Sequence, residues 1–110
     1  MEYNFFNDRR KNLRKQVQIK ASVQLTELIK GVGYLKDVTL ESVRISTPDL
    51  FAFFNQEQAE LFQDKVLMVA LPSEALTLKG KIIRVDTAKD ELIVMISSVS
   101  DAEAWKKLCR

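Results

Sequence analysis

The sequence predicts an all-β fold, a small antiparallel barrel with a short C-terminal α-helix. Residues 16–26 alternate between apolar and polar side chains, which is the period of a strand with one buried face. Several short runs rich in β-branched residues follow, separated by turn signals. The last ten residues instead show a helix-start pattern. A small sheet avoids exposed edges most simply by closing on itself, so we expect a barrel.

Six strands can be placed along the chain. They are predicted over residues 16–26, 34–40, 43–47, 66–71, 76–86 and 91–97. Gly31 and Gly33 are expected to mark a turn after the first strand. Gly80 is expected to cause a bulge or bend within the long fifth strand.

Two segments predict helical structure. Phe51, Phe54 and Leu61 fall at helical spacing, which favours a short helical turn within residues 50–62. The aromatic residues of this stretch are expected in the core: Phe51, Phe53, Phe54 and Phe62. Near the C-terminus, Ser100 and Glu103 form a capping-box pattern. A helix should follow, with Trp105 and Leu108 on one face that packs against an open end of the barrel.

The bulk composition fits one domain over residues 1–110, with an N-terminal arm (1–14), a barrel (15–97) and a terminal helix (100–109). No apolar run approaches the ~20 residues of a membrane helix, and the N-terminus lacks a secretory pattern. We therefore expect a cytoplasmic protein without membrane insertion. Cys109 is the only cysteine and there is no histidine. An internal disulfide is thus excluded, and an enzyme or a metal site is not expected.

Positive charge gathers at the N-terminus. Residues 1–20 contain six basic and two acidic residues, a balance of +4, whereas the whole chain carries only +2. The remaining residues therefore sum to −2. A basic segment on a near-neutral domain suggests an anionic ligand or partner.

Two short motifs carry the functional prediction. Arg10 and Arg14 form an RxxxR pair before the first strand, with Arg9 beside it. Residues 37–42 read Asp-Val-Thr-Leu-Glu-Ser at the junction of the second and third strands. This arrangement resembles the PilZ domain, a bacterial receptor for cyclic di-GMP, whose signature is RxxxR followed by [D/N]xSxxG. Thr39 stands where the family usually has serine, and Ser42 where it usually has glycine.

The resemblance implies a regulatory ligand, cyclic di-GMP, and no other cofactor. The implied ligand-binding residues are Arg9, Arg10, Arg14, Asp37, Thr39 and Ser42. Arginine forks match both phosphate and guanine O6/N7, and a carboxylate can accept from guanine N–H groups. The arm would close over the ligand and signal to a partner protein in motility, adhesion, polysaccharide or virulence control.

Other interpretations remain open. The arginines can form a solvated basic arm, Asp37 can cap a turn, and Thr39 can be an ordinary strand residue. Ser42 would strain the backbone if its position requires a positive φ, and Glu41 adds a negative charge beside an anionic ligand. These departures suggest a PilZ-fold adaptor that binds no nucleotide. The basic arm also suggests a small nucleic-acid-binding barrel, although the outer positions of the first strand carry no aromatic platform.

Overall fold

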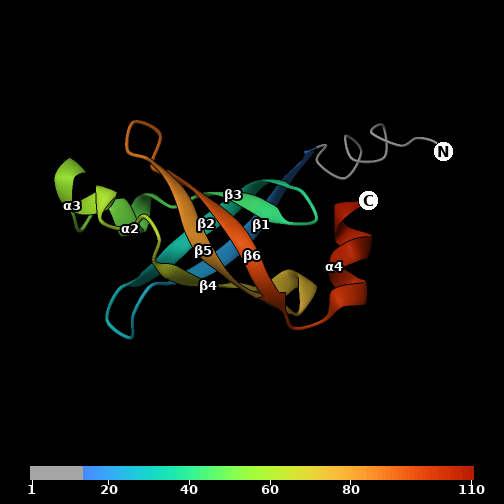
Figure 1. The fold of residues 1–110 in the computed structure, drawn as a ribbon. Coiled ribbons are helices and arrows are strands. Elements are labelled where there is room, and N and C mark those ends of the chain that lie inside the picture. The colour runs from blue at the N-terminus through green and yellow to red at the C-terminus, as the bar shows by residue number, and fades with distance from the viewer. Residues whose placement is uncertain (1–13) are drawn as a thin grey trace.

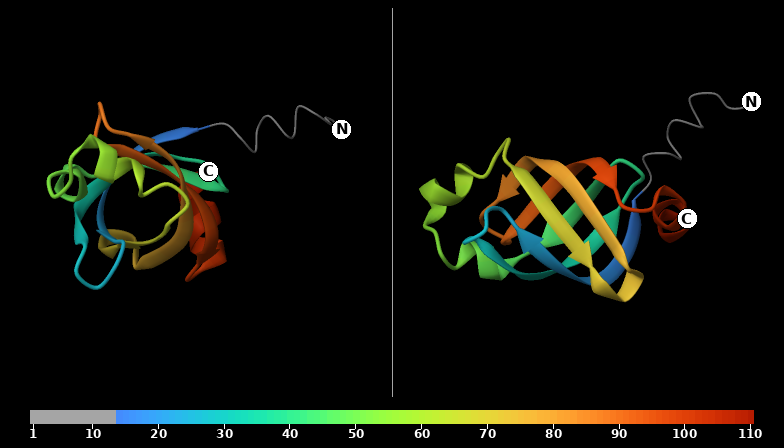
Figure 2. Two further views of the ribbon diagram at one scale, coloured as in Figure 1. Left: turned by 60° about the vertical axis from the view of Figure 1, so that its left-hand side comes forward. Right: turned by 90° about the horizontal axis from the view of Figure 1, so that it is seen from below.

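The computed structural model describes residues 14–110; the predicted arm residues 1–13, with Arg9 and Arg10, lie outside this range. Six strands form one closed barrel (Figure 1). They are β1 (Lys15–Gln24), β2 (Lys30–Val38), β3 (Ser42–Ser46), β4 (Val66–Leu71), β5 (Leu76–Asp86) and β6 (Glu91–Val99). The order around the barrel is β1-β2-β3-β6-β5-β4, and every neighbouring pair is antiparallel. Pairing of β1 with β4 closes the ring (Figure 2), which confirms the predicted barrel.

The helices lie at opposite ends of the barrel (Figure 1). Between β3 and β4 the chain forms α2 (Pro48–Phe51) and α3 (Gln56–Glu60) at one end. The short helix η1 (Pro72–Glu74) follows β4, and the terminal helix α4 (Ala102–Cys109) packs at the end opposite α2 and α3, where its Trp105 is buried. We call the end with α4 and the β2–β3 turn the motif end, and the opposite one the α2–α3 end. No helix within residues 14–110 is both long and apolar enough to cross a membrane.

The barrel interior is filled by the apolar half of each alternating strand. Its fully buried side chains include Val23, Leu35, Val43, Ile45, Leu67, Val69, Leu71, Leu78, Ile82 and Leu92. Burying such a side chain contributes about 1.5–3 kcal/mol relative to leaving it in water. The period-two pattern seen in the sequence is thus the pattern that fills the core.

Gly31 and Gly33 do not form the predicted turn; both lie inside β2. The turn comes earlier, where the Thr26 hydroxyl accepts hydrogen bonds from the amides of Leu28 (3.2 Å) and Ile29 (3.0 Å). Gly33 is needed for close packing instead, because a Cβ there would lie 2.2 Å from the carbonyl oxygen of Ser46. Gly80 behaves as expected, since the β5–β6 register shifts beside it.

The start of α4 also differs from the prediction. Asp101, not Ser100, caps the helix, and its carboxylate accepts from the amide of Ala104 at 3.1 Å. The Ser100 hydroxyl instead accepts from the amide of Thr77 at 2.9 Å, which ties the end of β6 to β5. Local sequence could not distinguish two adjacent capping residues, because the choice depends on a contact with a strand 23 positions away.

The aromatic stretch was predicted only in part. It forms two short helices, and Asn55 and Gln58 make the capping box of α3. Phe51 and Phe62 are buried and Phe54 is half-buried, but Phe53 is 69% exposed, against the prediction. Because α2 ends at Phe51, the chain turns there and Phe53 points away from the core.

Candidate functional site

The site begins with a register shift that sets the orientation of Asp37. Leu35 pairs with Ile45, but Asp37 pairs with Arg44 and Val38 with Val43, so β2 gains one residue relative to β3. Residues opposite each other on neighbouring strands share a face of the sheet. Val38 therefore joins Val43 in the core, and Asp37 shares the outer face with Arg44. Without the shift, strict alternation from Leu35 would direct the carboxylate into the barrel.

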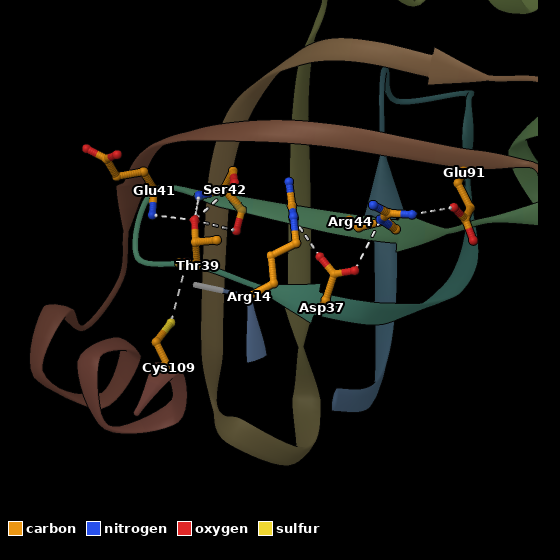
Figure 3. Close-up of polar contacts among 8 residues, drawn as sticks. All are labelled: Arg14, Asp37, Thr39, Glu41, Ser42, Arg44, Glu91 and Cys109. Atoms are coloured by element: carbon orange, nitrogen blue, oxygen red, sulfur yellow. Dashed lines mark hydrogen bonds and ion pairs between the residues drawn. The ribbon is translucent and has the colours of Figure 1, made fainter. Parts of the chain in front are cut away.

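Asp37 is held between two arginines (Figure 3). Arg14 Nη1 donates to Asp37 Oδ1 at 2.6 Å. Arg44 Nε lies 3.1 Å from Asp37 Oδ2, an ion pair that lacks hydrogen-bond geometry. Arg44 Nη1 also lies 3.5 Å from Glu91 Oε1 on β6. The Asp37 side chain is only 7% exposed, whereas both arginines are about one-third exposed, so they shield the carboxylate while keeping access to solvent.

The β2–β3 turn is built around the Thr39 hydroxyl (Figure 3). Thr39 Oγ1 accepts from the amides of Ser42 (2.9 Å) and Glu41 (3.2 Å), and it lies 3.0 Å from Ser42 Oγ. A hydroxyl that accepts from the following amides stabilises a tight turn. Thr39 therefore has a structural role here as well as a predicted ligand role.

Ser42 carries no backbone strain, although it stands where the motif that the sequence resembles usually has glycine. In the described part of the chain, positive φ angles occur at Asp64, Ala75 and Asp90, and not at Ser42. Any unfavourable effect of serine at this position therefore comes from its side-chain atoms, which contact Thr39. Figure 3 shows the exposed Glu41 carboxylate pointing away from the Arg14–Asp37 pair, so its charge acts on the site from a distance.

Helix α4 is attached directly to this turn. Trp105 Nε1 donates to the carbonyl of Leu40 at 3.1 Å, and the Cys109 thiol donates to the carbonyl of Thr39 at 3.6 Å. Lys15 Nζ donates to the carbonyl of Leu108 at 2.8 Å, a favourable position for a cation at a helix C-terminus. The β2–β3 turn, the start of β1 and α4 thus form one contiguous unit.

Burial raises the pKa of the Cys109 thiol to about 11, although nearby Lys15 acts to lower it. The thiol therefore stays protonated at neutral pH, as its hydrogen bond to the Thr39 carbonyl requires. Within residues 14–110, no group of three or more acidic or cysteine side chains is arranged to hold a metal ion.

The structure places the predicted site residues as follows. Arg14 and Asp37 are in direct contact, and Thr39 and Ser42 contact each other across the turn between β2 and β3. Sequence reasoning missed Arg44 and Glu91. Arg44 follows Ser42 by two positions, so its place on the same strand was predictable. Its contact with Asp37 was not, because it depends on the β2–β3 register.

A six-strand antiparallel barrel with this terminal helix is a PilZ-like fold. Among solved structures, the chain is similar to the PilZ domain of CeSA from a cellulose-synthesizing bacterium. That match has a TM-score of 0.63 and 16% sequence identity, and it covers 89% of this chain and 95% of the other. The Bacillus subtilis inhibitor of motility (MotI/DgrA) matches with a TM-score of 0.58 and 14% identity over 88% of this chain and 47% of that one. No protein-family model matches the sequence, and no curated protein matches it significantly.

Proposed function

We propose that this chain is a cyclic di-GMP-binding regulatory module that changes conformation with its ligand and signals to a partner protein. The observation that carries the proposal is the 2.6 Å contact between Arg14 Nη1 and Asp37 Oδ1. These residues belong to two motifs 23 positions apart, and each motif alone is common by chance. Their contact on a PilZ-like barrel supports a shared site.

The chemistry of this site suits a guanine dinucleotide. Arg14, together with Arg9 and Arg10 of the N-terminal segment, supplies guanidinium forks for phosphate and for guanine O6/N7. Asp37 accepts from guanine N–H donors, and the Thr39 and Ser42 hydroxyls reach nearby polar atoms. Binding exchanges the Arg14–Asp37 ion pair for contacts with the ligand. Because Arg14 is 36% exposed, this exchange costs little desolvation.

Arg44 acts as a positioning residue in this proposal. When Arg14 turns to the ligand, Arg44 continues to hold the Asp37 carboxylate in its orientation. Glu91, only 16% exposed, keeps Arg44 in place from β6. The hydrogen bonds from α4 to the Thr39 and Leu40 carbonyls then carry any movement of the turn to the terminal helix, which offers a surface that a partner can detect.

Titration calorimetry with cyclic di-GMP tests the proposal. Wild-type protein should bind with micromolar affinity or better, and Arg14→Ala and Arg10→Ala should each weaken binding at least tenfold. Lys30→Ala removes one exposed positive charge at the opposite end of β2 and is the matched control, with less than twofold change expected. Absence of heat at 500 μM ligand, confirmed by an unchanged melting temperature, would refute the proposal.

A second candidate is a PilZ-fold adaptor that binds no nucleotide. One observation favours it: the polar groups of the second motif are already engaged by other side chains of this chain. Asp37 is paired twice, and the Thr39 and Ser42 hydroxyls share one contact. Ser42→Gly separates the two candidates. A receptor weakened by this serine should gain affinity in the variant, whereas an adaptor should show no binding in either form.

A further inference from the structure

A groove of about 550 Å³ lies at the α2–α3 end, far from the proposed ligand site. Its apolar lining consists of Leu25, Ile29, Phe54, Leu61, Phe62 and Val66. We call it the distal groove. Leu61 is 70% exposed and Val66 51% exposed at its margin. A groove of this size, largely apolar and exposed at its margin, is typical of a binding surface.

The segments that flank the distal groove are acidic in balance, although Lys65 lines the groove itself and Asp64 is paired with Lys81 at 3.8 Å. Residues 25–30 and 48–66 contain five acidic residues and two lysines, a balance of −3. The acidic residues are Glu27, Asp49, Glu57, Glu60 and Asp64. Glu57 and Glu60 lie on α3, the helix that also carries the groove residue Gln58. An occupant should therefore combine large apolar side chains with adjacent positive charge.

This chain contains a segment with that chemistry. Residues 1–14 place Tyr3, Phe5 and Phe6 just before the cations Arg9, Arg10, Lys11 and Arg14. The aromatic residues match the apolar lining, and the basic residues match the acidic surroundings. Aromatic side chains bury a large area with few rotatable bonds, so they are efficient anchors in such grooves.

The position of β1 indicates that the N-terminal segment in the distal groove comes from another molecule. β1 begins at the motif end, whereas α2 and α3 lie at the opposite end (Figure 1). Residues in and beside α3 line the distal groove, so it belongs to that opposite end. Phe6 is eight residues before Arg14, so a fully extended chain carries it at most about 29 Å. The longest axis of the molecule is 48 Å. A neighbouring copy can present the same segment without spanning its own barrel.

We infer that the distal groove binds the aromatic and basic N-terminal segment of a second copy of this chain. The contact joins two different surfaces, so it is heterologous. Reciprocal exchange gives a dimer, and one-way exchange gives a longer chain. The groove shares no residue with the motif end. Arg9 and Arg10 belong both to this segment and to the proposed nucleotide site, so the inference is tested without nucleotide.

The test is complementation between two full-length variants, measured without nucleotide by analytical ultracentrifugation from 5 to 500 μM. Wild type should show a mass that rises above the monomer with concentration. Phe5→Ser/Phe6→Ser lacks the anchors, and Leu61→Glu places a charge at the groove margin; each should remain monomeric. An equimolar mixture of the two should associate again, because one supplies an intact groove and the other an intact segment.

A C-terminally labelled peptide of residues 1–14 gives a second measurement by fluorescence anisotropy. Leu61→Glu should raise its Kd at least tenfold, and the doubly charge-reversed Glu57→Lys/Glu60→Lys protein should weaken binding in low salt. Leu28→Glu is the matched control, because Leu28 is 94% exposed in the neighbouring turn and does not line the groove. Its Kd should change less than twofold.

Three outcomes would overturn the inference. One is a wild-type protein that stays monomeric at 500 μM with no peptide binding. Another is association that persists in Phe5→Ser/Phe6→Ser, which would assign the groove to a different contact. The third is a variant mixture that fails to associate although circular dichroism shows both variants folded.

Discussion

The motif end and the α2–α3 end of the barrel are stabilised by different forces. At the motif end, a carboxylate joins two arginines, and single hydrogen bonds attach α4 to the β2–β3 turn. At the α2–α3 end, Phe62 packs edge-to-face against Phe51 and Phe54, with ring centroids 6.0 and 5.1 Å apart. Charged contacts can be exchanged for a ligand at small cost, whereas aromatic packing cannot. In the proposed function, this difference assigns switching to the first end and rigidity to the second.

The largest effect is expected from Phe62→Ala. Phe62 is 4% exposed and contacts two other rings, so its truncation leaves a cavity. The free energy of unfolding should fall by about 3–5 kcal/mol. Denaturant unfolding in 50 mM and in 1 M NaCl should give the same loss, because the interaction is apolar. A loss below about 1 kcal/mol would show that α2 and α3 contribute little to the fold.

Asp37→Asn should have a smaller effect that depends on salt. The change removes the negative charge between Arg14 and Arg44. At low salt the free energy of unfolding should fall by about 1–2 kcal/mol, a modest amount because both arginines are partly exposed. In 1 M NaCl the difference from wild type should shrink, since salt screens the attraction. Asp64→Asn is the control: Asp64 is 71% exposed, and asparagine tolerates its left-handed backbone. Equal losses for both variants would contradict the special role of Asp37.

Arg44→Gln tests the positioning role. Stability should fall by only about 0.5–1 kcal/mol, because Arg44 is 32% exposed. Affinity for cyclic di-GMP should fall several-fold, because Asp37 loses the cation that orients it. In the double variant with Asp37→Asn, the second change should add almost nothing to the loss of affinity. Additive losses would show that Arg44 contacts the ligand itself or acts elsewhere.

The smallest effect concerns Cys109, whose folded pKa of about 11 lies above the ordinary value of 9.0. At pH 9 the folded protein should contain about 1% thiolate, and the unfolded chain about half. Alkylation by iodoacetamide should therefore accelerate about tenfold per pH unit until pH 11 in native protein, but level off near pH 9 in 6 M guanidinium. Lys15→Met should slow the native reaction further, because Lys15 favours the thiolate. A native profile that levels off near pH 9 would show that the packing of α4 on the β2–β3 turn does not shield Cys109.

The local pattern of residues was enough to predict much of this molecule. Alternation over residues 16–26 and the apolar run 66–71 predicted two strands whose structural bounds are Lys15–Gln24 and Val66–Leu71. These strands depend on residue type and spacing, which the chain expresses locally. Arg14 and Asp37, both predicted to bind the ligand, are in contact, and their ligand role stays a prediction. The glycine turn and the Ser100 cap were wrong because both positions have partners far away in sequence. The burial of Phe53 was wrong because α2 ends at Phe51.

By itself, the sequence determined which side chains can fill a barrel and which can hold an anion, since both follow from polarity and period. The tertiary structure decided the face on which each motif residue lies. A one-residue shift between β2 and β3 turns Asp37 outward toward Arg44 and Val38 inward toward Val43. That choice lies in the pairing of two strands, where side-chain direction reverses with every residue of register.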